Sequence, residues 1–251
     1  MAIEPKVHAV DADKFPADKA SKWENQPLES DQLYLSHNAL RNEINSMIQA
    51  LGTFIGKNDS VPEWAINTIK EWWSSHIAHA TDHCKSEERM YKPMFSERFK
   101  WPAEIDELHD ALDSVQDKVQ TAIDGLNTEK STLIGVRDAL LTYEETMLKH
   151  FEVEETTAVP LMRAFFSPEE VSDVQRKILE EGPENAMGAL IYTMSPDGAK
   201  FRSEFMKERN IPAFVWFLAF KGRLAHYKKD VVAKVEAIES GKEPAKKSGW
   251  F

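Results

Sequence analysis

Two histidines in the sequence each carry a glutamate four residues later, His83 with Glu87 and His150 with Glu154. On an α-helix this spacing places both side chains on one face, about 6 Å apart along the axis. The pairs belong to a recurring pattern, because HCKSEERMYKP and HFEVEETTAVP both read H-x-x-x-E-E-x-x-x-x-P. Imidazole and carboxylate groups on one helix face can bind a metal ion, so each pair is a candidate metal-binding face.

The segments that carry these pairs are predicted to be helices. Between residues 31 and 162 apolar residues recur at spacings of three and four, which is typical of helices with one buried face. Three groups of turn-forming residues separate the segments, at residues 56–59, 92–102 and 125–128. We expect Ser60 to cap the second helix, Pro93 to begin an irregular link, and Pro160 to disrupt the fourth helix near its end. Short links favour antiparallel neighbours, so the fold class is all-α, an up-down antiparallel four-helix bundle.

Two further histidines complete the arrangement. His37 lies near the start of the first helix and His109 near the start of the third, whereas His83 and His150 lie near the ends of the second and fourth. In an up-down bundle these four positions meet at one end. Four histidines and two glutamates would suit a pair of metal ions about 3.5 to 4 Å apart.

This order of residues resembles the hemerythrin-like HHE cation-binding domain over about residues 31 to 165, including the Glu-Glu pair and the trailing proline. The resemblance implies two non-haem iron ions, Fe²⁺ or Fe³⁺, bridged by an oxo or hydroxo group. It also implies that Glu87 and Glu154 bridge the ions. The terminal ligands would be His37, His83, His109 and His150. Ferritin-like di-iron proteins instead use Glu-x-x-His, which these helices lack.

The sequence departs from the oxygen-carrying hemerythrins of that family. Those proteins have five histidines, two of them one turn apart on the third helix, and an aspartate on the fourth. Here Asp113 stands one turn after His109, and the pair on the fourth helix ends in Glu154. A simple oxygen carrier therefore fits less well than sensing, oxidation chemistry or iron handling.

Other polar residues near the motif have open roles. His79 could be a fifth histidine ligand, and both His76 and His79 could instead pack or hydrogen-bond to the metal shell. Glu88 and Glu155 are expected to lie behind the ligands or on the surface. Cys84 follows a ligand in sequence but is expected to face another direction, as a buried and unreactive thiol.

The flanking segments carry no catalytic motif. Residues 1–30 are predicted to be a polar arm, and residues 166–251 a C-terminal extension of additional helices packed on the bundle. Ser167, Pro168 and Glu170 form a well-defined helix start. An aromatic cluster in the extension is expected to pack against the bundle, or else to form a surface for a protein partner or reductase; its residues are Phe214, Trp216, Phe217 and Phe220.

Composition excludes several classes of protein. The 31 basic and 42 acidic residues give a formal net charge of -11, which argues against nucleic acid and anionic membranes as partners. The single cysteine cannot form an internal disulfide. The longest apolar run, residues 211–220, is about half of the roughly 20 residues that cross a bilayer. The sequence thus predicts a soluble, cytoplasmic protein.

Three classes of function stay open. The first is a di-iron protein that binds or senses dioxygen or a related small ligand, or handles iron, without turnover of an organic substrate. The second is a di-iron oxidase or peroxidase acting on a small molecule, which requires a pocket that reaches the metal. The third is a helical interaction module that binds zinc or no metal, because imidazole and carboxylate ligands do not by themselves select iron.

Overall fold

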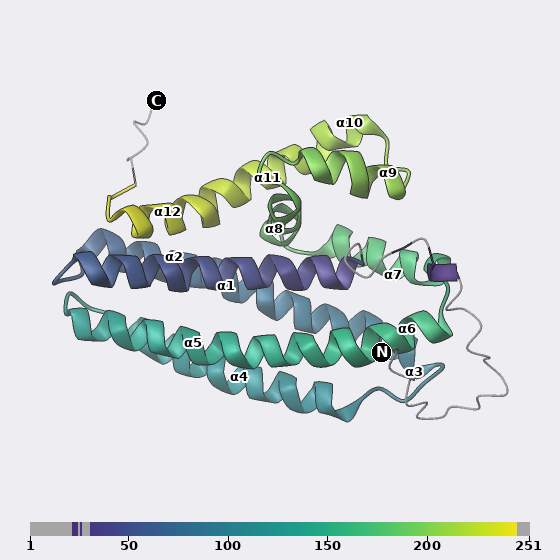
Figure 1. Cartoon of the computed structure of the whole chain (residues 1–251), viewed down its shortest axis with the longest axis horizontal. Helices are drawn as coiled ribbons and strands as arrows, with labels where there is room; N and C mark the ends of the chain where they lie inside the picture. Colours follow the sequence, from purple (N-terminus) through teal and green to yellow (C-terminus); the bar gives the residue numbers. More distant parts are fainter. Residues whose placement is uncertain (1–21, 25, 27–30, 245–251) are drawn as a thin grey trace.

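The computed structural model describes residues 22–24, 26 and 31–244. This part of the chain is helical, with one isolated bridge between Ser60 and Glu129 and no strand. Four long helices run up and down beside one another (Figure 1), which confirms the predicted bundle. They are α1 (Gln32–Lys57), α2 (Glu63–Ser86), α4 (Ala103–Asp124) and α5 (Lys130–Val153).

The starts of the first two helices are built differently. At α1, the Asp31 side chain accepts a hydrogen bond from the Leu33 backbone N–H at 3.0 Å, which satisfies one of the free donors of a helix start. At α2, Pro62 occupies the capping position and no side chain caps the helix. The prediction that Ser60 caps α2 was wrong, because the backbone there pairs with the loop before α5.

Two π-helical turns continue α2 and α5 beyond their ligand pairs. They are Glu87–Tyr91 and Glu154–Ala158. In each, the backbone N–H of the next residue donates to the carbonyl of the glutamate five residues earlier. Pro93 and Pro160 then lie in the first turns of α3 (Lys92–Ser96) and α6 (Val159–Phe165). The prediction that an irregular link begins at Pro93 was wrong, because a proline is tolerated in the first turn after such a register change and α3 continues to Ser96. Near Pro160 the helical ladder is disrupted as predicted, by the π turn that precedes it.

A polar layer divides the core of the bundle. One apolar cluster fills the middle of the bundle and includes Trp72 and Tyr143, and a second fills the end near α3 and α6. His37 lies between Leu33 of the second cluster and Leu40 of the first. The histidines predicted from the sequence therefore lie inside the fold, where their polar atoms are shielded from water.

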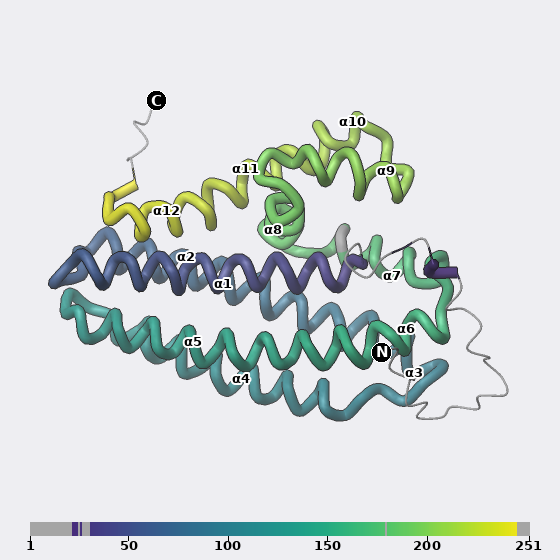
Figure 2. The backbone as a smooth tube through the Cα atoms, in the orientation of Figure 1, coloured from purple at the N-terminus to yellow at the C-terminus, as the bar shows by residue number. Residues whose placement is uncertain are grey.

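The extension packs on α1 and α2, as Figure 1 and the tube in Figure 2 show. Its first helix has the predicted start, since Ser167 and Glu170 form a reciprocal capping box. A third apolar cluster lies within the extension and includes Trp216. The labelled helices of the extension are α7 (Pro168–Glu181), α8 (Glu184–Met194), α9 (Met206–Glu208), α10 (Ala213–Val215), α11 (Lys221–Tyr227) and α12 (Ala233–Ser240).

The predictions for the flanking aromatic residues hold only in part. Trp216 is buried, but Phe214 and Phe217 are 62% and 64% exposed, so the aromatic cluster does not pack as a unit. Most of the predicted polar arm lies outside the described residues. Its Trp23 is buried and donates its indole N–H to the Phe166 carbonyl at 2.8 Å. Among the described helices, none is long and apolar enough to cross a membrane.

Candidate metal centre

The two helical pairs are formed as predicted. On α2 and its π turn, His83 Nε2 lies 3.1 Å from Glu87 Oε1. On α5 and its π turn, His150 Nε2 lies 3.3 Å from Glu154 Oε2. Each glutamate is the first residue of its π turn, so the widened turn begins at a candidate ligand. Such turns occur frequently at functional sites.

The lone histidines of α1 and α4, His37 and His109, complete a ring of donors. His37 Nε2 lies 3.1 Å from Glu154 Oε2 and 3.9 Å from Glu87 Oε1. His109 Nε2 lies 3.5 Å from Glu87 Oε2. Glu87 also lies 3.9 Å from His150 Nε2. All six residues predicted from the sequence therefore meet at one place, with Glu87 in contact with all four histidines.

The donor atoms at this place have no other partner. Eight buried side-chain atoms of the six residues lack a hydrogen bond. One is His150 Nδ1, and the other seven face one another: Nε2 of His37, His83, His109 and His150, both carboxylate oxygens of Glu87, and Oε2 of Glu154. A buried polar atom left without a partner costs about 1–3 kcal/mol. Seven such atoms aimed at one another form a set of nitrogen and oxygen donors that fits divalent or trivalent cations.

The second glutamate of each Glu-Glu pair fixes one of the lone histidines. Glu155 Oε1 lies 2.8 Å from His37 Nδ1, and Arg41 donates to both oxygens of Glu155 at 2.8 and 2.9 Å. Glu88 Oε1 lies 3.2 Å from His109 Nδ1. A carboxylate that accepts the Nδ1 proton leaves the Nε2 lone pair free to bind a metal ion.

Phe151 forms the apolar wall of the centre. Its ring stacks on His37, with centroids 4.1 Å apart, and lies edge-on to His83 at 5.7 Å. The side chain is buried. It therefore restricts the rotation of two imidazoles and keeps water away from that side.

The two carboxylates affect each other's ionisation. Burial and the neighbouring Glu87 carboxylate raise the pKa of Glu154 to about 8. Burial alone would also raise the pKa of Glu87, but the surrounding imidazoles hold it well below its usual range. Two carboxylates in one site behave this way because like charges disfavour ionisation of both.

The four imidazoles divide into two kinds. Burial lowers the pKa of His83 and of His150, each to about 3. Burial also disfavours protonated His37 and His109, but hydrogen bonds to the glutamates outweigh it and raise the pKa of His37 to about 10 and that of His109 to about 9. In the metal-free protein, protons on His37 and His109 therefore supply positive charge at the centre. A metal ion must displace these protons in order to bind.

Cys84 also reaches the centre. The donor atoms of Cys84, Glu87, His109 and His150 all lie within 4.8 Å of one another, as do those of a second group, His37, His83, Glu87 and Glu154. The expectation that Cys84 faces another direction was wrong. Its position three residues before Glu87 was the signal, because that spacing places both side chains on one helix face.

His76 and His79 lie apart from both donor groups and share a different partner. His76 Nδ1 lies 2.8 Å from Glu43 Oε2, and His79 Nδ1 lies 3.0 Å from Glu43 Oε1. All three are buried. The structure thus places His79 in a core carboxylate–histidine cluster. Sequence reasoning missed Glu43, although its position three residues after Leu40 and four before Met47 places it on the buried side of the helix.

Comparison with known proteins agrees with this geometry. The family described as hemerythrin HHE cation binding domain matches residues 28–162, which includes both ligand pairs and both lone histidines. No curated protein and no solved structure gives a significant match. The matched segment is more than half of the chain and contains the converging donors. The chain belongs to the hemerythrin HHE cation-binding domain family.

Proposed function

We propose that the centre binds two non-haem iron ions and that the protein uses them to bind or sense dioxygen or a related small ligand, or to handle iron. Glu87 and Glu154 would bridge the ions. The terminal ligands would be His37, His83, His109 and His150. The observation that carries the proposal is the set of buried, unpartnered nitrogen and oxygen atoms that converge from both helical pairs and both lone histidines.

When bound, a pair of irons supplies electrons to a small ligand and a positive charge that holds it. The protein groups prepare the site for this chemistry. Glu155 and Glu88 orient His37 and His109 through their Nδ1 atoms. Phe151 excludes water on one side. The donors are therefore fixed before a ligand arrives, which reduces the cost of binding.

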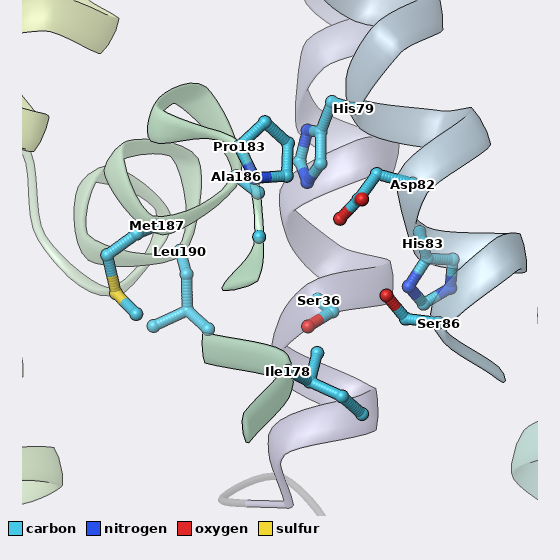
Figure 3. A pocket seen from close by; sticks show the side chains of 11 residues that line it. Ser36, His79, Asp82, His83, Ser86, Ile178, Pro183, Ala186, Met187 and Leu190 are labelled. Atoms are coloured by element: carbon cyan, nitrogen blue, oxygen red, sulfur yellow. The ribbon is translucent and has the colours of Figure 1, made fainter. Parts of the chain in front are cut away.

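A cavity of about 40 Å³ reaches the centre at His83. Figure 3 shows side chains of α2 on one side of this cavity and side chains of α8 on the other. Its walls include His79, Asp82, His83, Ile178, Ala186 and Leu190. At about 10–15 Å³ per water-sized occupant, the cavity has room for about three such molecules.

The size of this cavity favours a small inorganic ligand over an organic substrate. Dioxygen, nitric oxide and peroxide are each about as large as one or two waters. An oxidase acting on an organic molecule would need a larger pocket beside the metal, since such pockets commonly measure about 300–1,000 Å³. We therefore place binding or sensing first and turnover of an organic substrate second.

The test is metal content and visible absorption of the full chain produced in iron-replete cells. We expect about two irons per chain and a charge-transfer band that appears when the reduced protein meets oxygen. Glu87→Gln and Glu154→Gln should each lose the band and at least one iron, because each removes a bridging carboxylate. Glu152→Gln is the matched control, since Glu152 is exposed on α5 two residues before Glu154.

Three results would contradict the proposal. Zinc-loaded or metal-free protein with a silent spectrum would instead favour the helical interaction module. Steady oxygen consumption with an added organic reductant as substrate would favour the oxidase. Iron binding that is unchanged in both glutamine variants would place the metal elsewhere in the chain.

A further inference from the structure

The two donor groups of the centre are not equivalent. Both include Glu87. The group around His37 and His83 takes its fourth donor from Glu154, whereas the group around His109 and His150 takes its fourth donor from Cys84. One half of the centre is thus built from nitrogen and oxygen alone, and the other half has a sulfur atom within reach.

A single turn of α2 produces this difference. His83 and Cys84 are consecutive, so their side chains leave the helix about 100° apart. Glu87 lies three residues after Cys84 and four after His83, so its carboxylate stands between them on the helix surface. The turn therefore presents an imidazole to one donor group, a thiol to the other, and a carboxylate to both.

Packing alone is the alternative explanation for Cys84. The residue is half-buried and contacts the central apolar cluster, and a free cysteine often serves as a small apolar residue. Donor atoms of Glu87, His109 and His150 also lie within 4.8 Å of its sulfur, however. Nε2 of His150, Nε2 of His109 and Oε2 of Glu87 are all buried and lack hydrogen-bond partners. His150 is fully buried, so its free nitrogen is an independent sign of a cation at this group.

We propose that Cys84 Sγ is a direct ligand of the ion held by His109 and His150. This inference rests on the proposed two-metal function and adds a seventh ligand to it. On binding, the S–H bond is replaced by a metal–sulfur bond and the proton leaves to solvent. A thiolate is a softer and more electron-donating ligand than carboxylate or imidazole. The two ions would therefore differ in charge density and in their preference for metals.

X-ray absorption of the zinc-loaded full chain tests the ligand directly. Zinc–sulfur bonds are about 2.3 Å long, and zinc–nitrogen bonds about 2.0–2.1 Å. With two zinc ions bound, we expect one sulfur per chain, or half a sulfur per zinc. Cys84→Ala and Cys84→Ser should remove the sulfur shell. Ser86→Ala should keep it, because Ser86 lies on the same turn but belongs to neither donor group.

Titration with cobalt(II) gives a second readout that does not depend on activity. Thiolate bound to cobalt(II) produces a charge-transfer band in the near ultraviolet, and this band should be absent from Cys84→Ala. Cys84 is the only cysteine of the chain, so no other thiol can give the band. We expect the variant to bind the second ion at least tenfold more weakly than the native chain.

The possible outcomes separate this inference from the proposed function. Two bound ions with only nitrogen and oxygen neighbours, and no near-ultraviolet band, would overturn Cys84 ligation while leaving the two-metal centre intact. A chain that binds no metal would overturn both. A sulfur shell that disappears in both cysteine variants but persists in Ser86→Ala would establish the ligand.

Discussion

Replacing Glu43 with glutamine removes a charge from the core of the bundle without touching the metal donors. The two carboxylate oxygens of Glu43 lie 2.8 Å from His76 Nδ1 and 3.0 Å from His79 Nδ1. Burial alone would raise the pKa of Glu43, but the two histidines outweigh it and lower that pKa from 4.5 to about 2. At about 1.4 kcal/mol per pKa unit, this lowering corresponds to about 3 kcal/mol of stability at pH 7.

The sign of the pH dependence follows from the direction of this change. The folded-state pKa of Glu43 lies below the unfolded value, so the stabilisation is present above about pH 5 and is lost as the pH falls from 4.5 toward 2. The free energy of unfolding should therefore differ between the native chain and Glu43→Gln by about 3 kcal/mol at pH 7. The difference should shrink to about 2 kcal/mol at pH 3.5.

Urea unfolding of the metal-free protein, followed by circular dichroism at both pH values, measures this difference. Glu145→Gln is the control, because Glu145 is exposed on α5 and its replacement should change stability by less than about 0.5 kcal/mol. Metal content of Glu43→Gln should equal that of the native chain. A difference below 1 kcal/mol at pH 7, or one that does not shrink at low pH, would refute the assignment of Glu43 as a charged partner of the two histidines.

Three further predictions concern the centre and its access. Ala186→Phe should fill the cavity beside His83 and slow azide binding to the iron-loaded protein at least tenfold, with unchanged iron content. Stopped-flow absorption measures this rate. A rate equal to that of the native chain would show that azide enters the centre by another path. Metal loading at pH 7 should release about four protons per chain. Three come from His37, His109 and Glu154, whose pKa values are raised to about 10, 9 and 8, and the fourth comes from the Cys84 thiol if it binds the metal as proposed. Calorimetry in buffers of different ionisation enthalpy counts them, and a count near zero would contradict the charge distribution. Glu155→Gln should weaken metal binding about 10- to 100-fold, because it removes the carboxylate that orients His37. A competition titration with a chelator measures this affinity. Unchanged affinity would show that Glu155 does not orient His37.

The position of the centre could be predicted from the sequence because two independent regularities agree. The apolar periodicity fixes which residues face inward, and the alternation of helix direction fixes which ends meet. His37 and His109 carry no motif of their own. They become candidates only because they lie at the starts of the first and third helices of the bundle, at the same end as His83 and His150.

The π turns could not be read from periodicity in the same way. Proline normally ends or disrupts a helix, so Pro93 predicted the start of an irregular link and Pro160 a disruption near the end of the fourth helix. In the structure a wider turn begins at Glu87 and another at Glu154, and this shifts the helix register so that the proline falls at the start of a new segment. The repeated H-x-x-x-E-E-x-x-x-x-P pattern thus encodes a histidine–glutamate pair, a π turn that begins at the glutamate, and a new α-helical segment that begins near the proline.

Cys84 was missed for a related reason. A residue next to His83 points about 100° away around the helix, which for a single metal ion would exclude it from the site. A centre with two donor groups extends across a wider arc of the helix surface. Both neighbours can then contribute, one to each group, as the two sets of donors show.

The two donor groups of the centre differ in their access to small ligands as well as in their side chains. The C-terminal extension causes the difference in access. The cavity under α8 reaches His83, which belongs to the donor group without sulfur. The same group contains His37, whose Nδ1 contacts Glu155, a carboxylate that is 9% exposed and paired with Arg41. The corresponding carboxylate at His109 is Glu88, which is 53% exposed and so holds its histidine less firmly. A small ligand entering through the cavity would meet the ion held by His37 and His83 first. We therefore expect ligand exchange at that ion, while Cys84 occupies a position on the other and adjusts its charge.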